Sequence, residues 1–99
     1  MNIIEELKAL PFTLNIEHDT DGIFVQAQEF PDAFVEEDTL DEALKSLAQS
    51  MKDWVNVLSA EFPKWRKGRE ELVPYFLKIL VSSEEELTSC LRSSKSANS

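Results

Sequence analysis

Four side chains in the first quarter of the chain have the chemistry to bind a divalent cation: Glu17, His18, Asp19 and Asp21. Carboxylate oxygens and an imidazole are ordinary ligands for such ions. Their spacing argues against a metal site, because strand alternation sends Glu17 and His18 to opposite faces. Asp19 and Asp21 precede Gly22, and aspartates in such a turn hydrogen-bond to nearby backbone amides. The pattern therefore favours a turn, and we expect neither a metal nor a cofactor. A metal-dependent hydrolase using His18, Asp19 and Asp21 is the least favoured alternative.

The other residues that could act in catalysis lack the neighbours that catalysis needs. His18 is the only histidine, and no nucleophile pattern accompanies it. Ser82 and Ser83 precede a predicted helix and are explained by capping, and Cys90 is interpreted as a small apolar residue. The chain has only two glycines, which excludes a glycine-rich phosphate loop. We therefore expect a protein that is not an enzyme.

The composition is that of a small, acidic, globular protein. The 99 residues are 42% hydrophobic, which fits a single domain over residues 1–99 with one core. No apolar run reaches the length of a membrane span, and the acidic N-terminus does not resemble a signal peptide. We therefore expect a cytoplasmic protein with no membrane contact. An excess of 19 Asp and Glu over 10 Lys and Arg disfavours broad nucleic-acid binding.

The negative charge is concentrated in the first two thirds of the chain. Residues 1–62 contain 14 Asp and Glu and three Lys, a net charge of −11, whereas residues 63–99 carry +2. The only basic cluster is at 64–69. It is interpreted as a solvated linker or as an internal complement to the acidic half, with nucleic-acid contact through Trp65 as the alternative. A charge asymmetry of this size steers association with an oppositely charged partner, although it also fits simple solubility.

Two alternating runs around a turn predict a β-hairpin. Residues 12–17 and 23–28 alternate apolar and polar side chains, and the turn between them contains Asp19, Asp21 and Gly22. We expect Gly22 to adopt a positive φ. Pro31 turns the chain again before a short third strand at 33–35, and a short helix at 3–9 precedes the hairpin.

The most regular helix signal begins at Thr39. Thr39 and Glu42 have the spacing of a reciprocal capping box, and the acidic residues of the first turn suit the positive end of the helix dipole. Apolar residues then recur every three or four positions as far as Leu58, and this stripe must be buried, most simply against the sheet. Trp54 lies at the margin of the stripe and either widens it or anchors a partner.

The segment at 72–81 fits two structures. Its alternation favours a strand, whereas its apolar residues also suit a helix in which Pro74 occupies the first turn. Ser83 and Glu86 predict a second capping box and a helix at 84–92, and the polar tail at 93–99 is expected to be disordered. Together these elements predict an α+β fold with the order β-β-β-α-β-α. A small three- to four-stranded, antiparallel-rich sheet is backed by one long helix, with the core at about residues 12–81.

The hairpin, turn and helix together resemble the HicB-type antitoxin family. In that family, Asp-x-Asp-Gly lies between two strands. The pattern continues with Pro-Gly-small, three residues, Gly-Asp-Thr, an apolar residue, two acids and Ala-Leu. Here the corresponding residues are Asp19 to Gly22 and, without gaps, Pro31 to Leu44. The resemblance covers roughly residues 12–60. Asp32 and Glu37 stand where the family prefers glycine, so these turns must either avoid the left-handed conformation or carry strain.

The resemblance implies a partial RNase H-like fold and a function without catalysis. Members of the family bind a small basic toxin of HicA type, which cleaves RNA, and shield its catalytic site. Many also have a C-terminal DNA-binding domain, which is either a helix-turn-helix or a ribbon-helix-helix. Residues 63–99 match neither of these, so DNA binding is not expected. The alternative is a stand-alone HicB-like regulatory or phage-associated module without a toxin.

The resemblance and the charge asymmetry together suggest where a basic partner would bind. Glu36, Glu37, Asp38 and Asp41, at the third strand and the helix start, are the expected contacts, with Trp54 as a further anchor. They would compete for the surface on which the toxin holds RNA phosphates. The exposed sheet edge and the apolar residues at 70–92 also predict a homodimer or a dimer of dimers.

Overall fold

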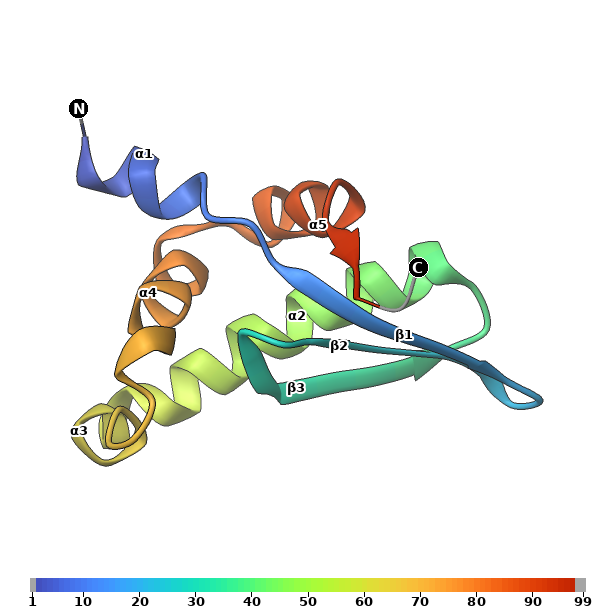
Figure 1. Ribbon diagram of the computed structural model, residues 1–99, viewed down its shortest axis with the longest axis horizontal. Coiled ribbons are helices and arrows are strands. Elements are labelled where there is room, and N and C mark those ends of the chain that lie inside the picture. Colours follow the sequence, from blue (N-terminus) through green and yellow to red (C-terminus); the bar gives the residue numbers. More distant parts are fainter. Residues whose placement is uncertain (1, 98–99) are drawn as a thin grey trace.

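The computed structural model describes residues 2–97, which form a four-stranded sheet with helices packed against it (Figure 1). No helix within these residues has both the length and the apolar character needed to cross a membrane. The elements follow one another as α1 (Ile3–Lys8), β1 (Thr13–Asp19), β2 (Gly22–Ala27), β3 (Phe30–Glu37), α2 (Leu40–Leu58), η1 (Ser59–Glu61), α3 (Phe62–Trp65), η2 (Glu70–Leu72), α4 (Val73–Val81), α5 (Glu84–Arg92) and β4 (Lys95–Ser96).

The predicted hairpin is present as β1 and β2. The two strands are antiparallel, and their register runs from Leu14 opposite Ala27 to Asp19 opposite Gly22. Gly22 has the expected positive φ, at 147°. A side chain there would also be obstructed, because a Cβ atom on Gly22 would lie 2.5 Å from the carbonyl oxygen of Glu37. The turn residue is therefore glycine for two reasons, backbone conformation and the close approach of β3.

β3 extends the hairpin into a meander and forms one edge of the sheet. It pairs antiparallel with β2, with an irregularity between Gln26 and Ala27. Asp32 and Glu37, which replace the family's glycines, both lie within this strand. No residue other than glycine has a positive φ within residues 2–97, so these positions avoid the left-handed conformation and carry no strain of that kind.

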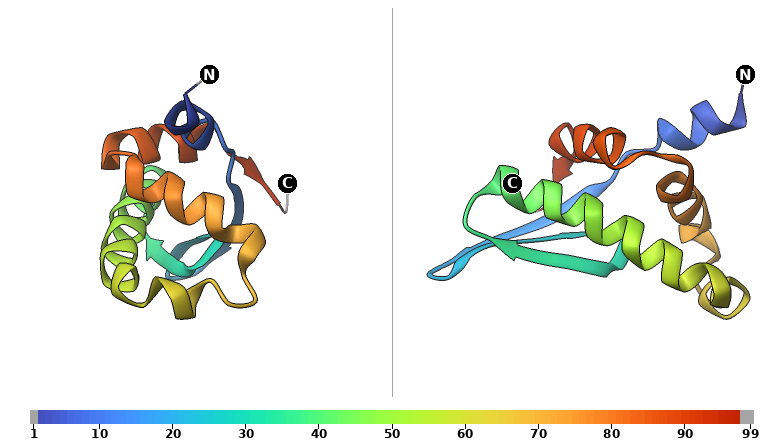
Figure 2. Two further views of the ribbon diagram at one scale, coloured as in Figure 1. Left: turned by 90° about the vertical axis from the view of Figure 1, so that its left-hand side faces the viewer. Right: turned by 180° about the vertical axis from the view of Figure 1, so that it is seen from behind.

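The long helix α2 backs the sheet as predicted. Thr39 caps it, with its hydroxyl accepting a hydrogen bond from the backbone N–H of Glu42 at 3.2 Å. The second predicted capping box, at Ser83 and Glu86 at the start of α5, is fully reciprocal. The buried residues of α2 follow the predicted apolar stripe: Ala43, Leu44, Leu47, Ala48, Met51 and Val55. Figure 2 shows α2 running along one side of the strands.

The preference for a strand at 72–81 is wrong, because residues 73–81 form helix α4. Pro74 lies in the first turn of this helix, where its missing N–H costs no intrahelical bond. Phe76 and Ile79, three residues apart, are buried in the core, as a helix allows. The core also extends beyond residue 81 to Leu87 and Leu91. The apolar residues expected to support self-association therefore pack largely within the chain itself.

The fourth strand comes from the tail that was expected to be disordered. Residues Lys95–Ser96 form β4, which pairs parallel with β1 at Thr13 and Leu14. The backbone N–H of Ala97 donates to the carbonyl of Leu14 at 2.7 Å and continues the pairing. Residues 98–99 of the predicted tail lie outside the described residues. The strand order is β3-β2-β1-β4, so the sheet is mixed.

An aromatic cluster closes one end of the core. Phe76 lies 4.8 Å from Trp65 and 4.9 Å from Phe62, measured between ring centroids. Trp65 is only 6% exposed, and its indole N–H donates to the Asp32 carboxylate at 2.8 Å. Arg69 also donates to Asp32 and lies over the Trp65 ring. Part of the predicted basic linker is therefore an internal complement to an acidic residue, whereas Lys64, Arg66 and Lys67 are exposed.

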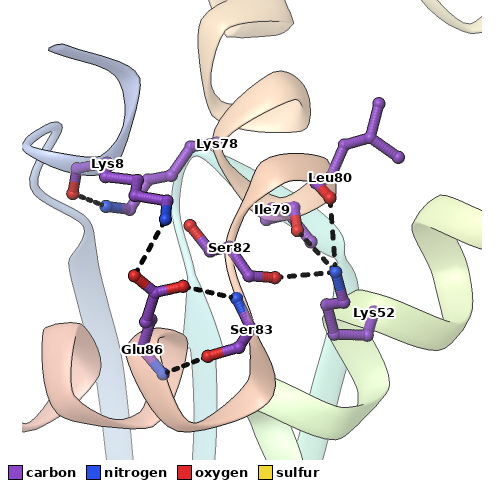
Figure 3. A network of polar contacts seen from close by, with 8 residues as sticks. All are labelled: Lys8, Lys52, Lys78, Ile79, Leu80, Ser82, Ser83 and Glu86. Carbon is purple, nitrogen blue, oxygen red and sulfur yellow. Dashed lines mark hydrogen bonds and ion pairs between the residues drawn. The ribbon is translucent and has the colours of Figure 1, made fainter. Parts of the chain in front are cut away.

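Two lysines donate hydrogen bonds to backbone carbonyls at the carboxyl ends of helices other than their own (Figure 3). Lys52 of α2 donates to the carbonyls of Ile79 and Ser82 at the end of α4, at 3.1 and 2.7 Å. Lys78 of α4, only 1% exposed, donates to the carbonyl of Lys8 at the end of α1 and lies over the Phe12 ring. A cation near the last carbonyls of a helix is favourable because of the helix dipole.

Candidate partner-binding surface

The predicted turn chemistry accounts for Asp19. Its carboxylate accepts hydrogen bonds from the backbone N–H groups of Asp21 and Gly22, at 2.8 and 3.0 Å. This is the local bonding that aspartate provides in a tight turn. Within residues 2–97, no group of three or more His, Cys, Asp or Glu side chains is placed to hold a metal ion.

Glu36 joins the turn aspartates to form an acidic end of the molecule. It is exposed near the end of β3, opposite Phe24, and its Cγ lies close to Gly22 in the turn. The negative charge of Asp19 raises the pKa of Glu36 above its usual value, with smaller contributions from desolvation and from Asp21. Carboxylates that repel one another in the free protein are available to a cationic partner.

The other three predicted contact residues point in different directions. The Glu37 carboxylate accepts a hydrogen bond from the Ser46 hydroxyl at 3.1 Å, on the side where α2 covers the sheet. Asp41 forms an ion pair with Arg92 of α5 at 2.7 Å and another with Lys45 at 3.4 Å. The hydrogen bonds from Arg92 lower the pKa of Asp41. Asp38 is exposed between β3 and α2. Glu36 is therefore the member of this set whose charge faces like charges rather than cations.

The pKa of Glu36 predicts a pH-dependent stability effect. A carboxyl group with a raised pKa in the folded state stabilises the fold below its unfolded pKa, and this contribution is lost as pH rises through the folded pKa. Replacing Glu36 with glutamine should therefore raise the melting temperature slightly at pH 7, with the gain disappearing below about pH 4. Thermal melts followed by circular dichroism across this pH range would measure it. The exposed Glu71→Gln is the control, and an equal gain from both variants would contradict the assignment.

Trp54 lies outside the buried stripe of α2. It is 43% exposed, beside the exposed Val57, and both line a shallow hollow with Ser50 and Asp53. The interpretation that Trp54 widens the core stripe is therefore not supported. Its role as a partner anchor stays a prediction.

Two phenylalanines that the sequence patterns did not single out, Phe24 and Phe34, lie on the face of the sheet opposite α2. Phe34 is 60% exposed, and its ring centroid lies 5.9 Å from that of Phe24. Glu17 and Glu36 are the residues opposite Phe24 on the two neighbouring strands. The signal was present in the sequence: Ile23, Val25 and Ala27 occupy the buried face, so alternation places Phe24 outward. A phenylalanine at an outward position, where alternation usually places a polar residue, therefore indicates an apolar contact on the outer face of the sheet.

The acidic and basic ends lie far apart. The β1–β2 turn and α3 lie at opposite ends of the longest axis of the molecule, which measures 39 Å (Figure 1). Asp19, Asp21 and Glu36 lie at the end with the β1–β2 turn. At the other end, the exposed Lys64 lies within α3 and the exposed Lys67 follows it. Exposed carboxylates and exposed lysines are therefore separated along the long axis, and the directional field expected from the charge asymmetry stays a prediction.

No protein-family model matches the chain, and no curated protein matches its sequence. Among solved structures, the fold matches a crystal structure from Syntrophomonas wolfei subsp. wolfei, described as the antitoxin part of a proposed toxin/antitoxin system. The TM-score is 0.77 at 21% sequence identity. The two chains share a fold. The match covers 89% of this chain and 65% of the other, so this chain spans slightly less than two thirds of that antitoxin. The predicted α+β class is thereby confirmed.

Proposed function

We propose that this chain is an antitoxin of HicB type, which binds and masks a small basic toxin of HicA type without catalysis of its own. The observation that supports the proposal most directly is the fold shared with an antitoxin, at a TM-score of 0.77. The residues that resemble the HicB pattern, from Asp19 to Gly22 and from Pro31 to Leu44, form the hairpin, β3 and the start of α2. The resemblance thus concerns the hairpin, β3 and the start of α2, while the shared fold covers 89% of the chain.

The charge distribution supplies a physical mechanism. A protein that cleaves RNA must hold phosphates with Lys and Arg side chains. A partner that presents carboxylates to those side chains competes directly with the RNA. The acidic end of this molecule, with Asp19, Asp21 and Glu36, has the charge needed for such competition. Electrostatic complementarity of this kind accelerates association and selects a basic partner.

The test is binding and inhibition with the product of the neighbouring gene. This chain is co-expressed with the product of the adjacent gene, which the proposal requires to be a small basic protein, and the complex is isolated through a tag on this chain. We expect a stable complex whose association rate falls steeply with salt, because exposed charges are screened. The basic protein should cleave RNA when it is alone, and adding an equimolar amount of this chain should suppress that cleavage. A neighbouring gene product that does not bind this chain and does not cleave RNA would end the proposal.

A further inference from the structure

The open face of the sheet carries an ordered arrangement of aromatic and acidic residues. Glu17 of β1, Phe24 of β2 and Glu36 of β3 lie opposite one another and form one row across the strands. In the next row, Gln26 is opposite Phe34. Phe24 is therefore flanked by a carboxylate on each side. The two carboxylate-bearing strands are two strand spacings apart, about 10 Å.

No helix covers this arrangement within the described residues. The buried residues of the sheet are on the other face, against α2: Leu14, Val25, Ala27 and Ala33. Phe34 leaves 60% of its surface exposed and packs against the half-buried Phe24. An aromatic pair that leaves one ring exposed on a polar face is typical of a protein-binding site, since aromatic residues are enriched at interface hot spots.

The charge around the aromatic pair determines the kind of occupant. Glu17, Glu36, Asp19 and Asp21 surround it on the turn side, and a like-charged surface would be repelled. A second copy of the chain, packed face to face, would bring these carboxylates together with their equivalents. Nucleic acid and anionic membranes carry the same sign of charge. Charge complementarity therefore favours a basic protein surface.

We propose that the open face formed by Glu17, Phe24, Phe34 and Glu36 is the docking surface for the basic partner, and that it receives an arginine side chain over Phe24. This inference rests on the proposed function and locates its contact on the sheet rather than at the start of α2. A guanidinium stacks on an aromatic ring and donates hydrogen bonds in its own plane, so it can reach a carboxylate on either side. A lysine ammonium lacks the planar fork and fits this row less well.

The raised pKa of Glu36 is consistent with this role. Its repulsion by Asp19 is relieved when a cation lies beside it, so partner binding should be accompanied by a lower pKa at this group. The aromatic pair provides the apolar contact, and the carboxylates provide direction. A central aromatic contact surrounded by charges is the usual arrangement of a small specific interface.

The experiment compares variants of this face with matched variants elsewhere. Phe34→Ala and Glu36→Lys alter the open face, while Leu80→Ala and Glu85→Lys make the same kinds of change on the exposed surfaces of α4 and α5. All four residues are exposed, and circular dichroism verifies that each variant is folded. We expect the first two variants to weaken binding to the neighbouring basic protein by about tenfold or more, and the controls to change it by less than about twofold.

The outcomes separate this inference from the proposed function. If the wild-type chain binds the basic protein and the open-face variants bind equally well, the docking surface is elsewhere and the antitoxin proposal stands. If the wild-type chain does not bind, the antitoxin proposal fails and this inference fails with it. If sedimentation shows that the wild-type chain alone is a dimer and Phe34→Ala is a monomer, the occupant is a second copy, which also overturns the inference.

A second measurement tests the arginine preference without the neighbouring protein. A short oligoarginine peptide and the oligolysine of equal length are titrated into the labelled chain and followed by NMR. We expect the shifts caused by oligoarginine to include the amides and ring signals of Phe24 and Phe34, and to be larger than those caused by oligolysine. Shifts confined to α2 and α5, or equal shifts from both peptides, would contradict the proposed contact.

Discussion

Replacing Gly22 with alanine is expected to destabilise the fold by about 2–4 kcal/mol, because it combines a strained backbone with a steric overlap. Gly22 has a φ of 147°, a conformation that other residues rarely adopt. The new Cβ would lie 2.5 Å from the carbonyl oxygen of Glu37, which is fixed in β3. Either the turn or the end of β3 must shift. Urea denaturation followed by circular dichroism measures the change in the free energy of unfolding.

Gly68→Ala is the matched control for this prediction. Gly68 also has a positive φ, at 75°, but nothing lies within 4 Å of a Cβ atom built there. We expect the free energy of unfolding of this variant to fall only by the cost of the left-handed conformation, about 1–2 kcal/mol. If the two variants are equally destabilised, the close approach between the turn and β3 does not constrain position 22.

Replacing Phe76 with alanine is expected to cost about 3–5 kcal/mol, which is a large share of the stability of a small domain. The Phe76 ring packs against Phe62, Trp65 and Phe30 at centroid distances of 4.9, 4.8 and 6.3 Å. Its loss leaves a cavity between α4, α3 and the sheet that these aromatic rings cannot close. The free energy of unfolding from urea titrations would measure the effect.

Leu80→Ala on the same helix provides the comparison. Leu80 is 45% exposed, so its truncation removes little buried surface, and its helix propensity changes little. We expect a cost of less than about 1 kcal/mol. A comparable loss from both variants would mean that α4 is stabilised by its helical character rather than by the aromatic cluster.

The parts of the fold that were predicted from the sequence are those specified by local patterns. The hairpin follows from alternation around Asp19 to Gly22, and α2 follows from the Thr39 cap and its apolar stripe. Residues 73–81 carry an alternating pattern and a helical pattern at once, and Pro74 fits the start of either element. Packing decided between them, since Phe76 and Ile79 reach the core together only from a helix. β4 has two residues and no pattern of its own, and its pairing with β1 is a tertiary contact.

The sequence predicted which acidic residues the candidate site contains, but not the directions in which their side chains point. Glu36, Glu37, Asp38 and Asp41 are adjacent in sequence, yet a strand end and a helix start send their side chains to different neighbours. The sequence does not show that Arg92, 51 residues away, would pair with Asp41. The exposure of Phe34 was similarly hidden, because it depends on which face of the sheet α2 covers.

The lysine contacts at the helix ends impose an order on how the helices open. The carboxyl end of α1 depends on Lys78 of α4, and the carboxyl end of α4 depends on Lys52 of α2. Release of α1 leaves the other two helices intact, whereas release of α2 removes the support of both. Local opening should therefore become progressively harder from α1 through α4 to α2, as expected when stability is distributed unevenly among cooperative units. The amino-terminal helix is thus the part of the molecule that can detach while the sheet and its open face persist.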